Sequence, residues 1–315
     1  MRVFVAGATG VLGRRLVGEL AERGHDVVGL TRDDRGDEVV ESGGGTPHRG
    51  DLFDRESLES GAAGADVVVQ AATAIPTGGD EKTWALNDRV RREGAENLTA
   101  AAAAVDADRY LQESVVWVAR RPDGSAFDED SPVHPTPTTE SAIDAERIAR
   151  EAGETEGFGV AVLRGGWFYA ADSAHTRDFG RRLLRRRLPV VGRGVLGRRD
   201  ARLSYLHVDD AATAYAAAVE GDATGTFHVV DDEPRTYAAF VRGLAERLGA
   251  PRPLRIPAWL ARLAVEDDVV RLLANPTPTS NARFREAFDW APAYPTIGAG
   301  LDAVVECWRA EGFPP

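Results

Sequence analysis

The sequence predicts an α/β fold with a doubly wound parallel sheet and a smaller, mostly helical lobe toward the C-terminus. Three observations favour this class. Short apolar runs alternate with amphipathic helical patterns through residues 1–230, which is typical of βαβ units and a parallel sheet. The first of these runs leads through closely spaced glycines into a helix. Beyond residue 233 helical patterns dominate, so we expect the lobe to form mainly there.

Residues 2–13, RVFVAGATGVLG, carry most of this prediction. The apolar run at residues 3–6 is typical of a central strand that is buried on both faces. Of the glycines after it, Gly7 allows a tight turn, Gly10 lets the backbone approach a pyrophosphate, and Gly13 lets the next helix lie close to the strand. Free N–H groups at a helix start bind phosphate. The sequence therefore predicts a dinucleotide site whose residues include Gly7, Thr9, Gly10, Val11, Leu12 and Gly13.

The other elements follow from the spacing of apolar residues along the chain. The first helix has its apolar stripe at Leu12, Leu16 and Leu20, and Gly24 is placed to end it. Further strands are predicted at residues 26–30, 46–49, 66–70, 109–118, 159–163 and 226–230. Further helices are predicted at residues 83–105, 138–146, 209–219 (with Asp209 as its N-cap), 237–248, 258–273, 280–288 and 297–309.

Composition narrows the class of protein. The net charge is −12, which argues against nucleic-acid binding even though arginines are dense between residues 177 and 202. There is no 18-residue apolar run and no signal peptide, so we expect a cytoplasmic protein without a membrane partner. One cysteine, Cys307, and scattered histidines predict neither a disulfide nor a metal site.

The residues at the end of the second predicted strand indicate whether the cofactor is NAD or NADP. An acidic side chain there accepts a hydrogen bond from the 2′-OH of NAD, whereas an arginine pairs with the 2′-phosphate of NADP. Arg32 follows Thr31 at this point, which favours NADP. Asp33 and Asp34 keep NAD as the alternative. Small residues after the fourth strand leave room for the ribose and pyrophosphate, namely Ala71, Ala72 and Thr73.

Two stretches resemble a known family. GATGVLGR, from residue 7, resembles the opening of the extended, epimerase/dehydratase-like branch of the short-chain dehydrogenase/reductase superfamily, and YLHVDDAA, from residue 205, is similar to a second motif of that branch. The resemblance implies a Rossmann fold and an NAD(P)-dependent oxidoreductase or epimerase that acts on a small carbonyl or hydroxyl compound. It also implies Asp51 and Leu52 beside the adenine, Arg164 in a turn beside the nicotinamide, and Ser114 as the catalytic serine that hydrogen-bonds the substrate oxygen.

The family's catalytic pair is missing. The resemblance places a tyrosine and, four residues later, a lysine on the helix after Ser114, where the tyrosine is the general acid or base. Those positions hold Thr138 and Ala142, which cannot do that chemistry. On the loop after Arg164, Trp167 would form an apolar wall of the substrate site, and Tyr169 and His175 are the nearest groups that could donate a proton.

These observations predict a nucleotide-binding domain at residues 1–165, completed by about residues 204–232, and a substrate lobe at residues 166–203 and 233–315. Two functions remain open. The first is an NADP- or NAD-dependent oxidoreductase or epimerase-like enzyme with an unusual proton donor, and the second is an NADP-binding redox sensor without turnover. The expected partner is a small-molecule substrate, and a homodimer stays open as the assembly.

Overall fold

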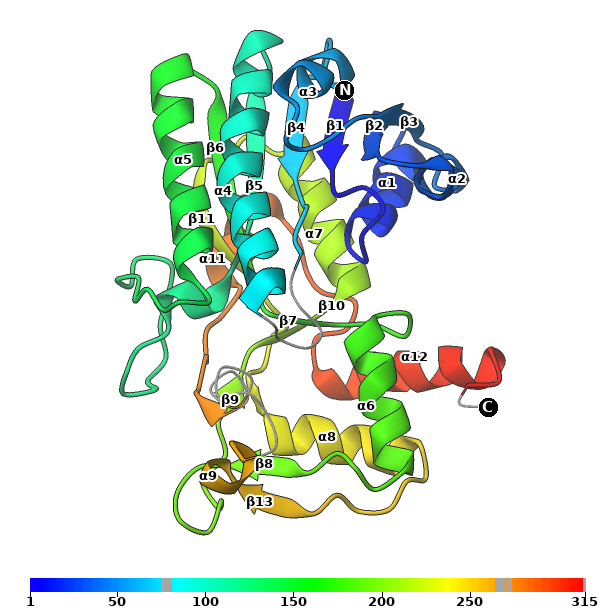
Figure 1. Cartoon of the computed structure of the whole chain (residues 1–315), viewed down its shortest axis with the longest axis vertical. Coiled ribbons are helices and arrows are strands. Elements are labelled where there is room, and N and C mark those ends of the chain that lie inside the picture. The colour runs from blue at the N-terminus through cyan, green and yellow to red at the C-terminus, as the bar shows by residue number, and fades with distance from the viewer. Residues whose placement is uncertain (75–80, 264–269, 271–273, 314–315) are drawn as a thin grey trace.

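The centre of the molecule is a parallel sheet of seven strands. The structure, a computed structural model, describes residues 1–74, 81–263, 270 and 274–313. The strand order is β11-β6-β5-β4-β1-β2-β3 (Figure 1), and it reverses between β1 and β4, which confirms the predicted doubly wound fold. The strands are β1 (Arg2–Ala6), β2 (Asp26–Thr31), β3 (Thr46–Arg49), β4 (Val67–Gln70), β5 (Arg109–Val115), β6 (Gly159–Gly165) and β11 (Gly225–Val229).

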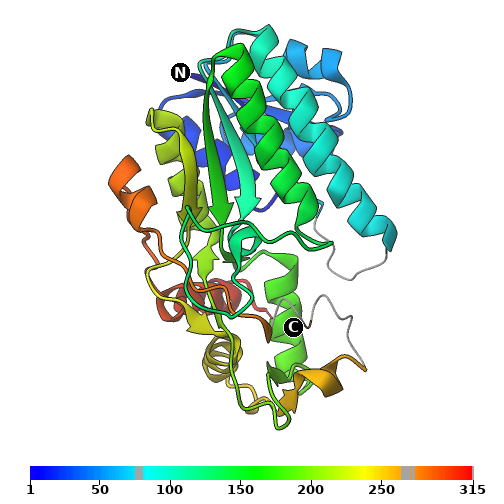
Figure 2. The ribbon, with the colours of Figure 1, turned by 90° about the vertical axis from the view of Figure 1, so that its left-hand side faces the viewer.

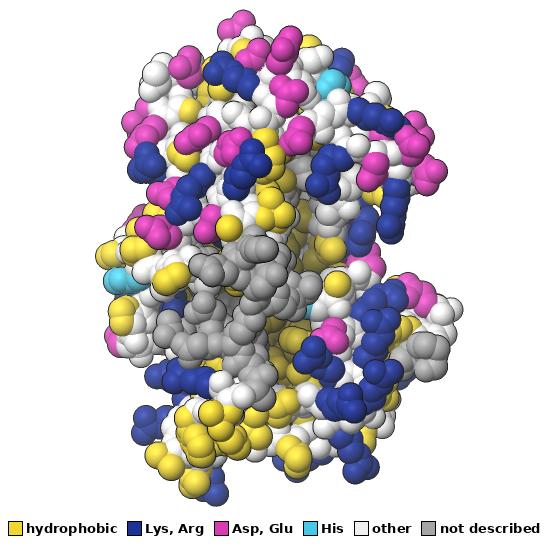
Figure 3. Space-filling view, in the orientation of Figure 1, with side chains coloured by type: hydrophobic (Ala, Val, Ile, Leu, Met, Phe, Trp, Pro, Cys, Tyr) yellow, Lys and Arg dark blue, Asp and Glu magenta, His cyan; other side chains and the backbone are white. Residues whose placement is uncertain are grey.

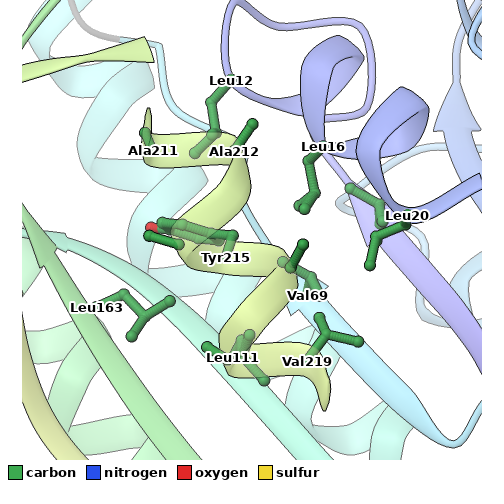
Figure 4. Close-up of a cluster of buried hydrophobic side chains, with 14 of the residues drawn as sticks. Leu12, Leu16, Leu20, Val69, Leu111, Leu163, Ala211, Ala212, Tyr215 and Val219 are labelled. Carbon is green, nitrogen blue, oxygen red and sulfur yellow. The ribbon is translucent and has the colours of Figure 1, made fainter. Parts of the chain in front are cut away.

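Helices cover both faces of the sheet (Figure 2). One layer contains α3 (Arg55–Gly61), α4 (Glu81–Ala104) and α5 (Glu140–Glu156), and the other contains α1 (Gly13–Glu22), α2 (Asp34–Ser42), α7 (Val208–Glu220) and α11 (Ala282–Phe288). In Figure 4 the apolar stripe of α1 faces Tyr215 and Val219 of α7, with Val69 and Leu111 of the sheet beneath them. This packing excludes water from the central strands, so the site can form only at their ends.

A second apolar core lies in the lobe beyond the carboxyl ends of the strands (Figure 1). Its helices are α6 (Ala174–Leu184), α8 (Tyr237–Arg247), α9 (Ala258–Ala261) and α12 (Ile297–Ala310). Three short strand pairs join them: β7 (Trp167–Tyr169) with β10 (Tyr205–His207), β8 (Val190–Gly192) with β13 (Arg255–Pro257), and β9 (Arg202–Leu203) with β12 (Arg235–Thr236). The described helices are not long and apolar enough to cross a membrane.

The structure corrects several predicted elements. β5 ends at Val115, where its partner β6 also ends, and the chain continues as a short 3₁₀ helix, η1 (Val116–Ala119), instead of extending to residue 118. Asp209 is not the cap of α7, because the Nδ1 atom of His207 accepts the Asp209 N–H at 3.3 Å. Part of the helix predicted at 258–273 lies outside the described residues. The helices α2 and α3 were not predicted, and each is capped by an aspartate, Asp33 and Asp54.

Asp231, just after β11, predicts a measurable pH dependence of stability. Neither of its carboxyl oxygens makes a hydrogen bond within the described residues, and the residue is fully buried. Burial, with the nearby charge of Asp232, raises its pKa to about 8. The folded state therefore holds the proton more tightly than the unfolded chain, so this group's stabilising contribution is lost as the pH rises from about 4 to 8.

We expect Asp231→Asn to remove this dependence. In urea denaturation, the unfolding free energy of the variant minus that of the wild type should increase by up to about 1.4 kcal/mol for each unit of rising pH across this window. The exposed Asp222→Asn variant is the control and should follow the wild type. Parallel curves for Asp231→Asn and the wild type would show that the Asp231 carboxyl is ionised in the folded protein.

Candidate functional site

The turn between β1 and α1 forms a cradle. Gly7 has φ +87°, and a Cβ atom on it would lie 2.6 Å from the backbone carbon of Ala71. A Cβ atom on Gly13 would overlap the Gly7 carbonyl group, with its carbon only 2.7 Å away. On Gly10, by contrast, a Cβ atom would meet only the Gly7 oxygen at 3.2 Å. The fold thus requires glycine at two positions, and the third leaves open space above the turn.

The start of α1 lies beside Gly10, and the Arg14 N–H donates to the Gly10 carbonyl oxygen at 3.1 Å. Leu12 is the N-cap residue, but no side chain caps the helix, and its first turn contains no acidic residue. Thr9 is exposed and Val11 is half-buried at the rim. A helix start of this kind, beside a glycine that permits close approach, fits the pyrophosphate of a dinucleotide.

Two arginines in the first turn of α1 are already neutralised. Arg14 and Arg15 both bond the carboxylate of Asp172, which lies between β7 and α6, and Arg15 also bonds Asp209 of α7. The Arg15 guanidinium donates in addition to the Val11 carbonyl oxygen at 3.0 Å. This ion cluster connects the turn between β1 and α1 to the lobe.

Arg32 lies at the end of β2 with an exposed side chain that makes no hydrogen bond or ion pair to the described residues. Thr31 before it is buried, and its hydroxyl donates to Asp37 at 2.5 Å. Thr31 therefore stabilises the strand end, whereas the Arg32 guanidinium remains available to an external anion.

The acidic residues near Arg32 are bonded within the protein. Asp33 accepts the Gly36 N–H at 2.9 Å as the N-cap of α2. Asp34 and Asp37 both bind Arg49 of β3. The three carboxylates near Arg32 therefore already have partners within the protein.

The other residues predicted beside the cofactor surround the same end of the sheet. Asp51 is exposed, and its carboxylate accepts the Phe53 N–H at 2.9 Å. Leu52 is buried against α4. Ala71 and Ala72 are half-buried and Thr73 is exposed. These positions line the β3 and β4 ends, and their contacts with a cofactor stay a prediction.

Ser114 and Arg164 belong to a buried polar network instead of an open pocket. The Ser114 hydroxyl donates to Glu146 of α5 at 2.6 Å, and Arg164 donates to both oxygens of Glu146 at 2.8 and 2.7 Å. Burial opposes ionisation of Glu146, but the bonds from Arg164, with those of Ser114 and Arg150, hold its pKa below the usual value. The network ties α5 to β5 and β6. The role predicted for the Ser114 hydroxyl would require its bond to Glu146 to open. The place of the Arg164 turn beside the nicotinamide concerns the backbone and stays a prediction.

The positions of the missing catalytic pair are filled by packing. The Thr138 hydroxyl lies 3.2 Å from that of Thr136. Ala142 is buried in the first turn of α5, against the apolar residues after β5.

The lobe residues predicted beside the substrate differ in exposure. Trp167 is half-buried, and its ring meets that of His175 edge to face.

Neither predicted proton donor is exposed, and the Tyr169 hydroxyl has no hydrogen-bond partner among the described residues. Tyr169 is fully buried, and its hydroxyl lies against Gly300 of α12. The Nε2 atom of His175 lies 2.7 Å from the Phe168 carbonyl oxygen, and burial lowers its pKa. Both side chains thus support the lobe, and a proton transfer by Tyr169 would require this core to open.

Sequence reasoning missed three buried polar residues at the edge of the sheet. Glu113, next to Ser114 on β5, lies 3.9 Å from the Arg91 guanidinium of α4, and both side chains are almost fully buried. One turn earlier on α4, Asn87 accepts the Ala74 N–H at 3.1 Å and leaves its buried amide nitrogen unbonded. A charged residue inside a predicted buried strand was the available signal for Glu113.

Two further features were considered as sites, an arginine-lined pocket on the lobe and clusters of metal-ligating side chains. The arginines after residue 177 line an open pocket of about 310 Å³ at the end of α6, which appears as a basic area on the lobe in Figure 3. One of them, Arg182, pairs with Asp178 at 2.6 Å. In the described part of the chain no three His, Cys, Asp or Glu side chains lie together as metal ligands.

Comparisons with known proteins show the family and support the fold. The profile of the NAD-dependent epimerase/dehydratase family matches residues 3–230. A 3-diazoavenalumate denitrifying reductase from a Streptomyces species is 36% identical and covers 96% of this chain and 99% of its own. Two solved structures show the same fold: the human epimerase family protein SDR39U1 with NADPH (TM-score 0.81, 20% identity, 97% and 99% covered) and UDP-glucose 4-epimerase from Thermus thermophilus with NAD (TM-score 0.77, 23% identity, 96% and 99% covered).

Proposed function

The chain belongs to the NAD-dependent epimerase/dehydratase family, and from this premise we propose that it is an NADPH-dependent reductase of a small organic substrate. The cradle at Gly10 carries the proposal, because it combines open space with a helix start whose N–H groups have no side-chain cap. The turn holds the pyrophosphate, Arg32 pairs with the 2′-phosphate, and residues 71–73 lie beside the second ribose. A bound NADPH supplies hydride to the substrate.

Similarity supports reduction as the direction of the reaction. A relative that matches nearly the whole chain is named as a reductase of a diazo compound. We therefore propose that the substrate of this chain is a small compound with a carbonyl or diazo group, held against Trp167. The test is oxidation of NADPH, followed at 340 nm, with 4-nitrobenzaldehyde and with an aryl diazonium salt.

Arg32→Ala is expected to weaken NADPH binding about 10- to 100-fold and to leave NADH binding nearly unchanged, because the lost hydrogen bonds to a charged group contribute about 1.5–3 kcal/mol. Isothermal titration with each cofactor measures this. Arg198→Ala, which removes an exposed arginine of the lobe, is the matched control and should bind as the wild type does. Equal losses for NADPH and NADH would overturn the assignment of the 2′-phosphate to Arg32.

The second candidate is an NADP-binding redox sensor. Thr138 and Ala142 favour it, since the pair that donates the proton in the family is absent. Tight binding of NADPH without oxidation by any compound of the panel would support the sensor, whereas turnover would exclude it.

A further inference from the structure

Glu113 occupies an unusual place at the end of the sheet. It is the third residue from the end of β5, and 7% of its side chain is exposed. Its carboxyl accepts no hydrogen bond from the described residues, and its nearest cation, Arg91, is 3.9 Å away. A carboxyl that is buried without hydrogen bonds is costly, and such groups are concentrated at functional sites.

The strand register places Glu113 near the carboxyl end of β5. This position and Arg32 lie on opposite sides of the point between β1 and β4 where the strand order reverses. A doubly wound sheet binds a dinucleotide across the point where strand order reverses, one mononucleotide to each half. Arg32 directly follows β2, on the side proposed for the adenosine. On the other side, Gln112 of β5 pairs with Gln70 of β4, so Glu113 lies level with Ala71, whose backbone contacts the glycine turn. The nicotinamide and the substrate therefore belong over the ends of β4 and β5.

Three of the polar side chains predicted for this site are already bonded. Ser114 and Arg164 are held by Glu146, and the lobe histidine His175 is bonded to the Phe168 carbonyl oxygen. Within the described residues, Glu113 is the acid at the ends of β4, β5 and β6 whose oxygens have no hydrogen-bond donor. It thus has both the position and the unused capacity that a proton donor requires.

We infer that Glu113 is the acid of this site, a role that rests on the proposed reductase function. Glu113 gives its proton to the carbonyl oxygen while the carbonyl carbon accepts a hydride, with its electron pair, from the reduced nicotinamide. The C=O group becomes CH–OH, the nicotinamide is oxidised, and a carboxylate remains. Water that reaches the exposed part of the side chain returns the proton.

The surroundings of Glu113 suit this role. Burial raises its pKa to about 7, Arg91 of α4 opposes the rise, and Glu146 of α5 adds to it. The third helix that faces it, α7, contributes Tyr215, whose own pKa burial raises far above the usual value. Both protonation states of Glu113 are therefore populated near neutral pH, which is the condition for efficient acid catalysis.

The first test needs no substrate. NADP⁺ has a positively charged nicotinamide and NADPH a neutral one, so a carboxylate at this place favours NADP⁺. We expect the ratio of the Kd for NADPH to the Kd for NADP⁺ to rise at least about threefold between pH 6 and pH 8 in the wild type. The Glu113→Gln variant should keep the low-pH ratio throughout. Titration of the 2′-phosphate affects both cofactors and cancels in the ratio.

The second test uses 4-nitrobenzaldehyde and NADPH. Glu113→Gln should lower kcat about 10²- to 10⁴-fold with little change in cofactor affinity, and Glu113→Asp should restore part of kcat with a shifted pH profile. Glu151→Gln, on the exposed face of α5, is the control and should match the wild type. Thermal melting shows that each variant is folded.

The outcomes separate the two proposals. If wild-type protein binds neither cofactor, the proposed function fails. If it binds both, but Glu113→Gln keeps the wild-type pH dependence of the ratio or reduces the aldehyde at the wild-type rate, the role of Glu113 is overturned and the cofactor assignment stands.

Discussion

Replacement of Gly13 by alanine is expected to abolish nicotinamide binding and to destabilise the fold severely. The new Cβ atom would overlap the Gly7 carbonyl group and lie 2.8 Å from the Ala8 Cα atom. All of these are backbone atoms of the same turn, so no side chain can rotate away to relieve the contact. Helix α1 would have to move away from β1, and its N–H groups would no longer face the open space at Gly10. We expect no cofactor binding in titration and a loss of several kcal/mol of unfolding free energy.

The same helix provides the control. A Cβ atom on Gly18 would meet nothing within 4 Å, so Gly18→Ala should keep cofactor affinity and stabilise the protein by up to about 1 kcal/mol. A Gly13→Ala protein that binds NADPH as the wild type does would show that the turn can rearrange, and that the cradle is not the binding site.

Glu146→Ala is expected to cost about 3–5 kcal/mol of unfolding free energy, because it leaves the Arg164 guanidinium buried without its counter-ion. Arg164 is 3% exposed, and the Ser114 hydroxyl loses its acceptor at the same time. Urea denaturation measures the loss.

An exposed ion pair on the same helix is the matched comparison. Glu151 of α5 bonds Arg147 at 2.9 Å with both side chains largely exposed, so Glu151→Ala should change stability by less than about 1 kcal/mol. A similarly small loss of unfolding free energy for Glu146→Ala would mean that Arg164 bonds water or another acceptor. The polar network around Glu146 would then not stabilise the fold.

Apolar spacing was sufficient to predict most of the fold. The bounds of β3, residues 46–49, were predicted correctly, and α12 differs from its prediction by one residue. Helices α2 and α3 were missed because they are short and rich in charged residues, so their apolar stripes are weak. What defines them is a capping aspartate, and such a residue also occurs in ordinary turns.

The residues of the candidate site were harder to predict than the fold. Adjacent residues of a strand point to opposite faces of the sheet, and the sequence does not say which of two neighbours would face a bound ligand. Ser114 and Glu113 are adjacent polar residues in one apolar run, and only the observed end of β5 and the partner Glu146 distinguish them. Arg164 pairs with a residue 18 positions away in the chain. The sequence predicts Tyr169 on a loop, but pairing of β7 with β10 buries it in the lobe. These outcomes depend on long-range contacts, which local patterns do not contain.

The bonds from Arg14 and Arg15 to carboxylates affect how the protein would select a nucleotide. Their charge is compensated internally, so it adds little to the potential that an approaching polyphosphate experiences. With a net charge of −12, the long-range field of the molecule repels such a ligand. Under the proposed function, recognition then comes from short-range fit to the backbone turn and to Arg32, so that shape contributes more than long-range electrostatics to discrimination between nucleotides.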